Sequence, residues 1–219
     1  MQASTTTDSP APCILQLENL CFQYPQHPLL DGLSARIGAG VSLVLGGDGC
    51  GKTTLMRLLA GELPVQSGSL HIHGVSLKEQ PQAYRQQLFW IDPRTSAFDQ
   101  LTPLQFFAGQ RQNHPGFLAS DAPRLAALLE GLSLVPHIDK PLYMLSTGSK
   151  RKVWLTAALA AGAAVTLLDD PLAALDKPSI VFVLKQLATA ASDPAHAWVV
   201  AHFDGLAGVP LTKVISLGD

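Results

Sequence analysis

The sequence is poor in charge of either sign and has no charge-free run long enough to span a membrane. Its 219 residues carry 15 Lys and Arg against 17 Asp and Glu, a formal net charge of -2. Because a polyanion is held by a broad positive field, this balance argues against nucleic acid as the main partner. The longest charge-free run, residues 153–168, falls short of the roughly 20 apolar residues that a bilayer requires. We interpret it as a buried helix followed by a buried strand.

Cysteine is scarce, and the first residues lack the pattern of a secretory signal. Cys13, Cys21 and Cys50 are odd in number and follow no metal-ligand spacing, which suits a reducing compartment. Residues 1–12 have no basic start followed by an apolar segment, so we expect a flexible tail there. These features predict a cytoplasmic location. The densest basic cluster, in "GSKRKV", is typical of a solvated helix face.

Short β-rich segments alternate with helical patterns along the rest of the chain. This alternation predicts an α/β fold with a mostly parallel sheet covered by helices. One helix is expected between Gly51 and Gly61, and another with Pro178 in its first turn. Between Asp92 and Leu145 the helical pieces are interrupted by proline, which indicates an inserted helical lobe. The candidate strands are CILQLENL, GVSLVLG, QLFWI, AVTLL, AWVVA and KVISL.

The pattern G-x-x-x-x-G-K-T spans residues 46–53, between an apolar strand and a helix. This context distinguishes a phosphate-binding loop from a chance glycine-rich turn. The glycines let backbone amides turn toward phosphate, and the helix N-terminus favours the same charge. We expect Lys52 to reach the β- and γ-phosphates of ATP, Thr53 to offer its hydroxyl to Mg²⁺, and Thr54 to donate to phosphate oxygens. The expected nucleotide contacts are Gly46, Gly47, Asp48, Gly49, Cys50, Gly51, Lys52, Thr53 and Thr54.

Cys50 occupies a variable position of this loop. A small side chain fits there, but a thiol at a helix N-terminus is also a candidate for enhanced reactivity. We therefore hypothesise that alkylation of Cys50 blocks nucleotide binding.

The segment "LSTGSKRKV", residues 145–153, resembles the signature sequence of ATP-binding cassette (ABC) proteins, Leu-Ser-Gly-Gly-Gln at the start of a helix. Thr147 and Ser149 replace the middle glycine and the glutamine. Ser146 and the amide of Gly148 still suit an anion at a helix start. The resemblance implies a head-to-tail dimer, in which the signature of one subunit closes over ATP held by the phosphate loop of the other.

Three further positions match the family. Tyr24 in "CFQYPQ" matches the aromatic residue that stacks on adenine, and His202 matches the histidine that senses the γ-phosphate at the end of an apolar strand. Asp176 matches the loop that crosses the dimer interface, although capping of the helix entered at Pro178 is a compatible alternative. The resemblance implies one ABC ATPase domain over residues 13–219. It would be a P-loop NTPase (RecA-like) core with an N-terminal antiparallel β portion and a helical lobe inserted at about residues 93–160.

The sequence departs from the family at two positions near the expected chemistry. Asp169 matches the acid that orients Mg²⁺, but the next residue, normally a glutamate that polarises the attacking water, is Asp170. The carboxylate is one methylene shorter, and a misplacement of about 1 Å can cost about a hundredfold in rate. Where the family has a glutamine that touches Mg²⁺, this chain has Pro93, and Asp92 is the nearest substitute.

The segment that follows carries Phe98, Leu101, Phe106 and Phe107. In the transporters of the family, the corresponding lobe contacts the coupling helix of the membrane partner. Apolar residues at this spacing are also typical of a core. Both interpretations stay open at this stage.

The resemblance implies an ATP-hydrolysing subunit that binds ATP and Mg²⁺, dimerises on ATP and drives a separate permease. Asp170 and His202 would be catalytic, while Thr53 and Asp169 would lie at the metal. The subunit would sit on the inner face of the cell membrane through the permease alone. Asp170 and Pro93 favour an alternative: an ATP-gated, hydrolysis-poor regulatory cassette or the degenerate half of a heterodimer. A soluble cassette acting on DNA or ribosomes, and a small-molecule kinase, explain the motifs less well.

Overall fold

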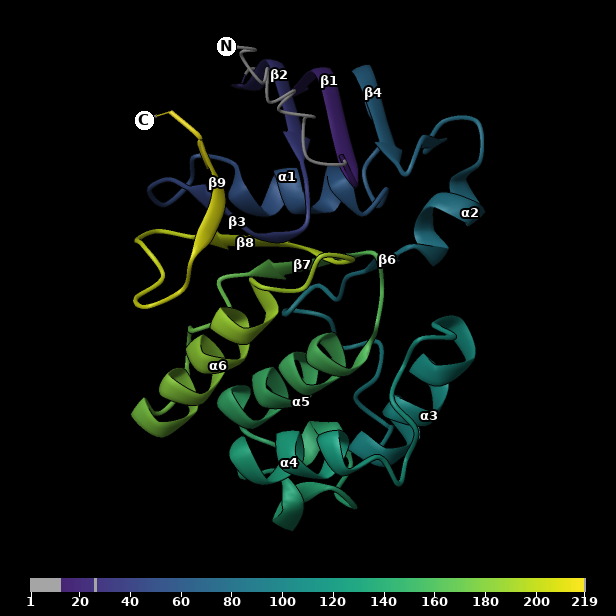
Figure 1. The fold of residues 1–219 in the computed structure, drawn as a ribbon, viewed down its shortest axis with the longest axis vertical. Helices are drawn as coiled ribbons and strands as arrows, with labels where there is room; N and C mark the ends of the chain where they lie inside the picture. The colour runs from purple at the N-terminus through teal and green to yellow at the C-terminus, as the bar shows by residue number, and fades with distance from the viewer. Residues whose placement is uncertain (1–12, 26, 219) are drawn as a thin grey trace, which may run out of the picture.

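Two sheets organise the chain, one antiparallel and one parallel (Figure 1). The computed structural model describes residues 13–25 and 27–218, so the tail expected at residues 1–12 lies outside the described residues. The strands are β1 (Leu15–Tyr24), β2 (His27–Ile37), β3 (Gly40–Leu45), β4 (Ser67–Ile72), β5 (Val75–Ser76), β6 (Leu88–Phe89), β7 (Val165–Asp169), β8 (Ala197–His202) and β9 (Leu211–Ser216).

The parallel sheet has the strand order β6-β7-β8-β3-β9, and the antiparallel sheet has the order β2-β1-β4-β5. In the parallel sheet, β3 and β8 stay in register up to the pair Leu45 and His202. β7 and β8 stay in register up to the pair Asp169 and Ala201. The expected α/β fold with an N-terminal antiparallel portion is confirmed. The carboxyl ends of β3, β7 and β8 therefore meet at one edge of the sheet.

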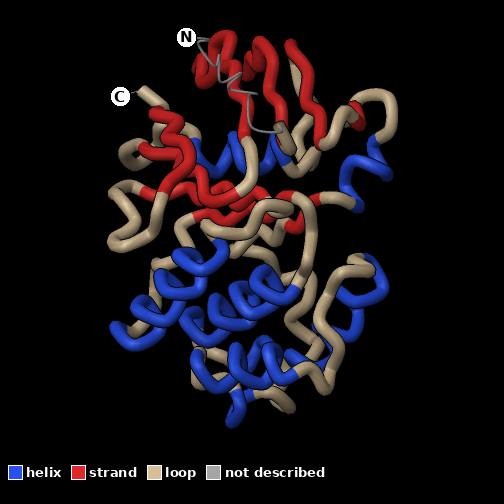
Figure 2. The backbone as a smooth tube through the Cα atoms, viewed as in Figure 1, coloured by secondary structure: helices blue, strands red, loops and turns tan. Residues whose placement is uncertain are grey.

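Helices cover both faces of the parallel sheet (Figure 1). α1 lies between the two sheets, and α5 and α6 pack on the opposite face, with α3 and α4 beyond them (Figure 2). Residues 92–145 form two helices and two 3₁₀ turns and contain no strand. The helices are α1 (Lys52–Leu59), α2 (Pro81–Gln86), α3 (Pro103–Asn113), α4 (Pro123–Gly131), η1 (Val135–His137), η2 (Leu142–Met144), α5 (Thr147–Ala160) and α6 (Lys177–Ala190).

The parallel sheet separates two apolar cores. One core surrounds α1 beneath the antiparallel sheet, and the other joins the sheet to α5, α6 and the helical lobe. Residues 153–160 of α5 are all buried, and so is every residue of β7. The charge-free run is thus a buried helix followed by a buried strand, as predicted.

Three aromatic rings tie the helical lobe to α5. The ring centroids of Phe106 and Trp154 lie 4.9 Å apart, and Phe98 lies 4.9 Å from Phe106 and 5.9 Å from Trp154. Phe106 and Phe107 are 1% and 0% exposed, and Phe98 and Leu101 are half-buried against the same core. The interpretation of this segment as an exposed coupling surface is therefore wrong for the two buried phenylalanines, which are core residues.

The strand prediction missed β2, β4 and β5 and overextended β6. β2 contains Pro28, Asp31 and Gly32, and β4 contains Gly68, so neither shows a continuous β-rich pattern. Both strands are instead held by antiparallel backbone pairing with β1. The segment "QLFWI" pairs with β7 through only Leu88 and Phe89 before it leaves the sheet.

Replacing Phe106 with alanine should lower the free energy of unfolding by about 3–5 kcal/mol, because it empties a ring-sized space in the core. Leu104→Ala is the matched control, since Leu104 lies on the same helix but is 44% exposed; it should cost less than about 1 kcal/mol. Urea unfolding followed by circular dichroism measures both. Similar small effects of the two substitutions would contradict the assignment of Phe106 to the core.

Candidate functional site

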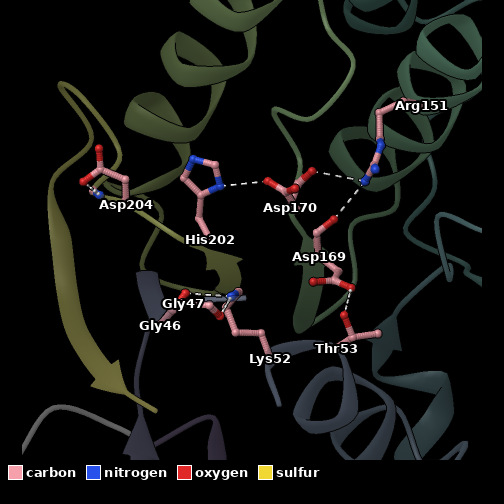
Figure 3. A network of polar contacts seen from close by, with 10 residues as sticks. Gly46, Gly47, Lys52, Thr53, Arg151, Asp169, Asp170, His202 and Asp204 are labelled. Atoms are coloured by element: carbon pink, nitrogen blue, oxygen red, sulfur yellow. Dashed lines mark hydrogen bonds and ion pairs between the residues drawn. The ribbon is translucent and has the colours of Figure 1, made fainter. Parts of the chain in front are cut away.

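The loop between β3 and α1 wraps around the side chain of Lys52. Gly49 and Gly51 have φ angles of 80° and 98°, a left-handed conformation that glycine adopts without strain. The Lys52 ammonium donates hydrogen bonds to the carbonyl oxygens of Gly46, at 2.6 Å, and Gly47 (Figure 3). This lysine is therefore held at the loop, where phosphate oxygens would compete with the carbonyls for it.

Thr53, in the first turn of α1, donates its hydroxyl to Oδ2 of Asp169 at 2.7 Å. Asp169 ends β7, and burial raises the pKa of its carboxyl while the hydrogen bond from Thr53 opposes that rise. Among the described residues, no cluster of three or more His, Cys, Asp or Glu side chains is arranged to hold a metal ion. Two adjacent hard oxygen donors instead fit Mg²⁺, which takes one or two protein oxygens and completes its shell with phosphate and water.

Asp170 and His202 face each other across the ends of β7 and β8. Nδ1 of His202 lies 2.9 Å from Oδ1 of Asp170 (Figure 3). The histidine side chain is 7% exposed and the aspartate side chain 42%. Asp170 has a φ of 46°, and its backbone N–H donates to the carbonyl of Ala201 at 2.9 Å. The backbone therefore turns at Asp170 and directs a short carboxylate toward the histidine while solvent still reaches it.

Arg151 joins the two aspartates from the helical side, a role that the sequence analysis did not find. Its guanidinium donates to the backbone carbonyls of Asp169 at 2.9 Å and Asp170 at 3.1 Å. Burial lowers the pKa of Arg151, and the charges of the two aspartates oppose this. The guanidinium remains a cation and anchors the start of α5 to the acid pair.

The neighbours of Arg151 are also engaged. Lys150 forms an ion pair of 2.6 Å with Asp99, and Lys152 forms one of 2.6 Å with Asp176. The prediction that this basic cluster is a solvated helix face is therefore wrong. The sequence signal that could have revealed these contacts was three successive cations, Lys150, Arg151 and Lys152, inside the signature-like segment.

Lys52, Thr53, Arg151 and the two aspartates line one cleft of about 310 Å³ at the edge of the parallel sheet. His202 does not line it and contacts Asp170 instead. The cleft contains many of the expected site residues, together with two arginines and a phenylalanine that were not expected. Gly46 and Gly47 contribute through their carbonyls beneath Lys52. The lining residues are Asp48, Gly49, Gly51, Lys52, Thr53, Thr54, Pro93, Arg94, Arg151, Asp169, Asp170 and Phe203.

Tyr24 lies beside the cleft. Its hydroxyl is 3.3 Å from the hydroxyl of Thr54. The ring packs edge-on against Phe22, with centroids 5.0 Å apart and an interplanar angle of 86°. Tyr24 is 40% exposed, so part of its ring is open to a planar ligand.

The signature residues do not line this cleft. Ser146 caps α5 by accepting a hydrogen bond from the amide of Ser149 at 3.1 Å. Gly148 packs so closely that a Cβ would come within 2.5 Å of the carbonyl oxygen of Ala174. Asp176 caps α6 by accepting from the amide of Ser179 at 2.9 Å, which confirms the capping alternative. The nucleotide cleft thus excludes Ser146, Gly148 and Asp176. Gly148 packs instead against Ala174, two residues before Asp176.

Asp92 and Pro93 differ in their relation to the cleft. Asp92 accepts a hydrogen bond from the amide of Arg94 at 2.9 Å, so its carboxylate is used within its own turn. Pro93 and Arg94 line the cleft, whereas Asp92 does not. The expectation that Asp92 substitutes for the missing glutamine is therefore not supported by its position.

Cys50 is not among the residues that line the cleft of Lys52. Its Sγ would lie 2.4 Å from a Cβ on Gly46 and is 3.9 Å from the Lys52 ammonium. Its side chain lines a second cleft between the phosphate loop, β2 and the end of β9. Cys50 thus supports the loop from behind.

Comparison with known proteins gives a consistent result. The family model described as "ABC transporter" matches residues 30–173. The chain is 32% identical over 180 residues to a cytochrome c biogenesis ATP-binding export protein, CcmA, of Pseudomonas syringae, covering 82% of this chain and 83% of that protein. It is 31% identical over 201 residues to CcmA of Legionella pneumophila, covering 91% of this chain and 96% of that protein.

Solved structures share the fold. A putative ABC transporter ATP-binding protein from Pyrococcus furiosus superposes with a TM-score of 0.75 at 22% identity, covering 93% of this chain and 96% of that chain. cbiO1 from Clostridium perfringens, part of the ABC transporter complex cbiONQ, superposes with a TM-score of 0.65 at 25% identity, covering 88% of this chain and 79% of that chain.

Alkylation of Cys50 should abolish ATP binding, because an adduct on a thiol packed behind Gly46 displaces the phosphate loop. Treatment with N-ethylmaleimide followed by a fluorescent-ATP binding assay measures the effect. Cys50→Ala is the control, since it keeps Cys13 and Cys21 as targets and should bind ATP whether treated or not. Undiminished binding by the alkylated native chain would contradict the prediction.

Proposed function

This chain belongs to the ABC transporter family of ATP-binding subunits, and we propose that it binds ATP at the Lys52 cleft and hydrolyses it to drive a separate membrane permease. One observation carries the proposal. The phosphate loop and an aspartate pair line a single cleft, and a histidine at the end of a third strand contacts the second aspartate of the pair. Each of these groups has a distinct task in hydrolysis of a nucleoside triphosphate.

Binding falls to the loop and the first turn of α1. Lys52 and the loop amides hold the phosphates, and Tyr24 offers its ring to adenine. Thr53 and Asp169 are the residues that would hold Mg²⁺. When bound there, the ion supplies positive charge that neutralises the β- and γ-phosphates. The hydrogen bond between Thr53 and Asp169 keeps both oxygens in place for this role.

Asp170 and His202 are proposed to carry the chemical step. Asp170 accepts a proton from the water that attacks the γ-phosphorus, the bond to the β-phosphate oxygen breaks, and ADP and phosphate result. His202 fixes the carboxylate through the contact of 2.9 Å, and its proposed second role, from its match to the family's histidine, is to sense the γ-phosphate. Because the aspartate is shorter than a glutamate, slow turnover is expected.

A second cassette is proposed to complete the site. Ser146, Gly148 and Asp176 do not line the cleft of their own chain, yet Ser146 and the amide of Gly148 lie at the start of a 14-residue helix that favours an anion. In a head-to-tail dimer they would face the ATP of the partner. ATP then closes the dimer, and hydrolysis reopens it. A heterodimer in which this chain is the slower half is the second candidate, which the short Asp170 favours.

A groove at the border of the helical lobe is proposed as the permease contact. It has a volume of about 410 Å³ and lies between the end of α1, α2, β6 and the end of α3. Nε1 of Trp90 and Nδ1 of His114, beside this groove, are buried without a hydrogen-bond partner among the described residues.

Within residues 13–25 and 27–218, no helix has both the length and the apolar character needed to cross a bilayer.

The identity of the membrane partner is proposed from the relatives. Both CcmA proteins are named as ATP-binding export proteins of cytochrome c biogenesis. We therefore propose an export-type complex, with the cassette on the inner face of the cell membrane and in contact with the bilayer only through its permease.

Magnesium-dependent ATP turnover tests the role of Asp170. Asp170→Asn should bind ATP but turn over at least about tenfold more slowly than the native chain, because an amide cannot accept the proton. Asp170→Glu should raise turnover, by up to about a hundredfold, because the longer carboxylate reaches the water better. If the native chain turns ATP over no faster than Asp170→Asn while Asp170→Glu turns it over faster, Asp170 is not a catalyst. That result would favour the ATP-gated alternative.

A bulky substitution in the groove tests the permease contact. Asn113→Trp fills the groove and should abolish co-sedimentation with membranes that contain the permease, while ATP binding stays within about twofold because Asn113 is remote from the nucleotide cleft. Lys185→Trp, at an exposed position of α6, is the matched control and should sediment like the native chain. Equal membrane binding by both variants would contradict the proposed contact.

A further inference from the structure

The turn that follows β6 presents an arginine to the nucleotide cleft. The amide of Thr95 donates to the carbonyl of Asp92 at 3.0 Å, which closes a four-residue turn. Pro93 occupies the second position, where its fixed φ favours such a turn. The carboxylate of Asp92 also accepts from the amide of Arg94 at 2.9 Å. Two hydrogen bonds and a proline therefore set the backbone of Arg94.

The guanidinium of Arg94 is a cation at the nucleotide cleft. Arg94 lines the same cleft as Lys52, Asp169 and Asp170. Burial raises the pKa of Asp169, and the positive charge of Arg94 is among the effects that oppose the rise. Among the described residues, however, the Arg94 side chain forms no hydrogen bond and no ion pair. Its positive charge thus acts on Asp169 and is available to a ligand in the cleft.

The other two cations that line the cleft already donate hydrogen bonds to backbone carbonyls. Arg151 donates to two backbone carbonyls behind the acid pair, and Lys52 donates to carbonyls of the phosphate loop. Arg94 is exposed and lines the cleft together with the two acids. A ligand group held there would be an anion, and arginine matches phosphate oxygens with two parallel donors.

We propose that Arg94 binds the γ-phosphate of ATP and makes the cassette discriminate ATP from ADP. The inference rests on the proposed ATP-binding function and adds a residue to it. The family has a neutral glutamine at this turn, whereas this chain has Pro93 followed by Arg94. The turn therefore carries a positive charge in place of an amide. Pro93 shapes the turn, and the residue after it supplies the contact.

Separate titrations with a non-hydrolysable ATP analogue and with ADP, both with Mg²⁺, test this role. Arg94→Ala should weaken affinity for the ATP analogue about tenfold or more, because a charge-assisted contact to phosphate is lost. Affinity for ADP should change by less than about twofold, because ADP has no γ-phosphate. Arg94→Lys should recover part of the difference, while the neutral Arg94→Gln should not.

Arg36→Ala is the matched control, since Arg36 is an exposed arginine on β2 that does not line the cleft, and it should leave both affinities unchanged. Thermal unfolding of each variant separates a folding defect from a binding defect. Equal weakening for both nucleotides, or none, in folded Arg94→Ala and Arg94→Lys would overturn the proposal while leaving ATP binding intact. If the native chain binds neither nucleotide, the proposed function fails, and the role of Arg94 fails with it.

Discussion

The parallel register of β3, β8 and β7 is the constraint on which the candidate site depends. Leu45 lies beside His202, and Ala201 beside Asp169, so the three strands end at nearly the same height. Parallel strands expose their carboxyl ends at one edge, where α/β sheets bind ligands. The register alone places the phosphate loop, the acid pair and the histidine together at that edge. Misregister by one residue would turn Asp169 toward the other face of the sheet.

A second layer of contacts holds the acids in position. Arg151 donates hydrogen bonds to the backbone carbonyls of Asp169 and Asp170. The carboxylate of Asp169 accepts from Thr53, and that of Asp170 contacts His202. Two adjacent carboxylates repel each other, and the guanidinium charge offsets part of that repulsion. Because Arg151 belongs to the first turns of α5, its two hydrogen bonds link the signature helix directly to the backbone of the acid pair.

The sequence alone predicted those parts of the fold and site that have strong local patterns. Glycine spacing identified the phosphate loop, and the apolar strand before Asp169 located the acid pair. The antiparallel β2 and β4 were missed because their pairing with β1 depends on backbone hydrogen bonds between distant segments. Arg151 was assigned to a solvated face because charge composition does not reveal that its partners are backbone carbonyls. Such partners can be recognised only once the two segments are side by side.

The two departures from the family differ in their physical consequence. Exchange of glutamate for Asp170 keeps the charge and shortens the reach, and the φ of 46° together with the contact to His202 partly determines where the shorter carboxylate lies. Exchange of glutamine for Pro93 removes a side chain that can coordinate, but the turn that the proline forms directs Arg94 into the same cleft. The loop lysine, the buried Asp169 and Arg94 nevertheless line one cavity. The charge arrangement therefore keeps the groups suited to binding a triphosphate with Mg²⁺, and the two departures fall on the positions where the family resemblance places groups that act on the attacking water and on the metal.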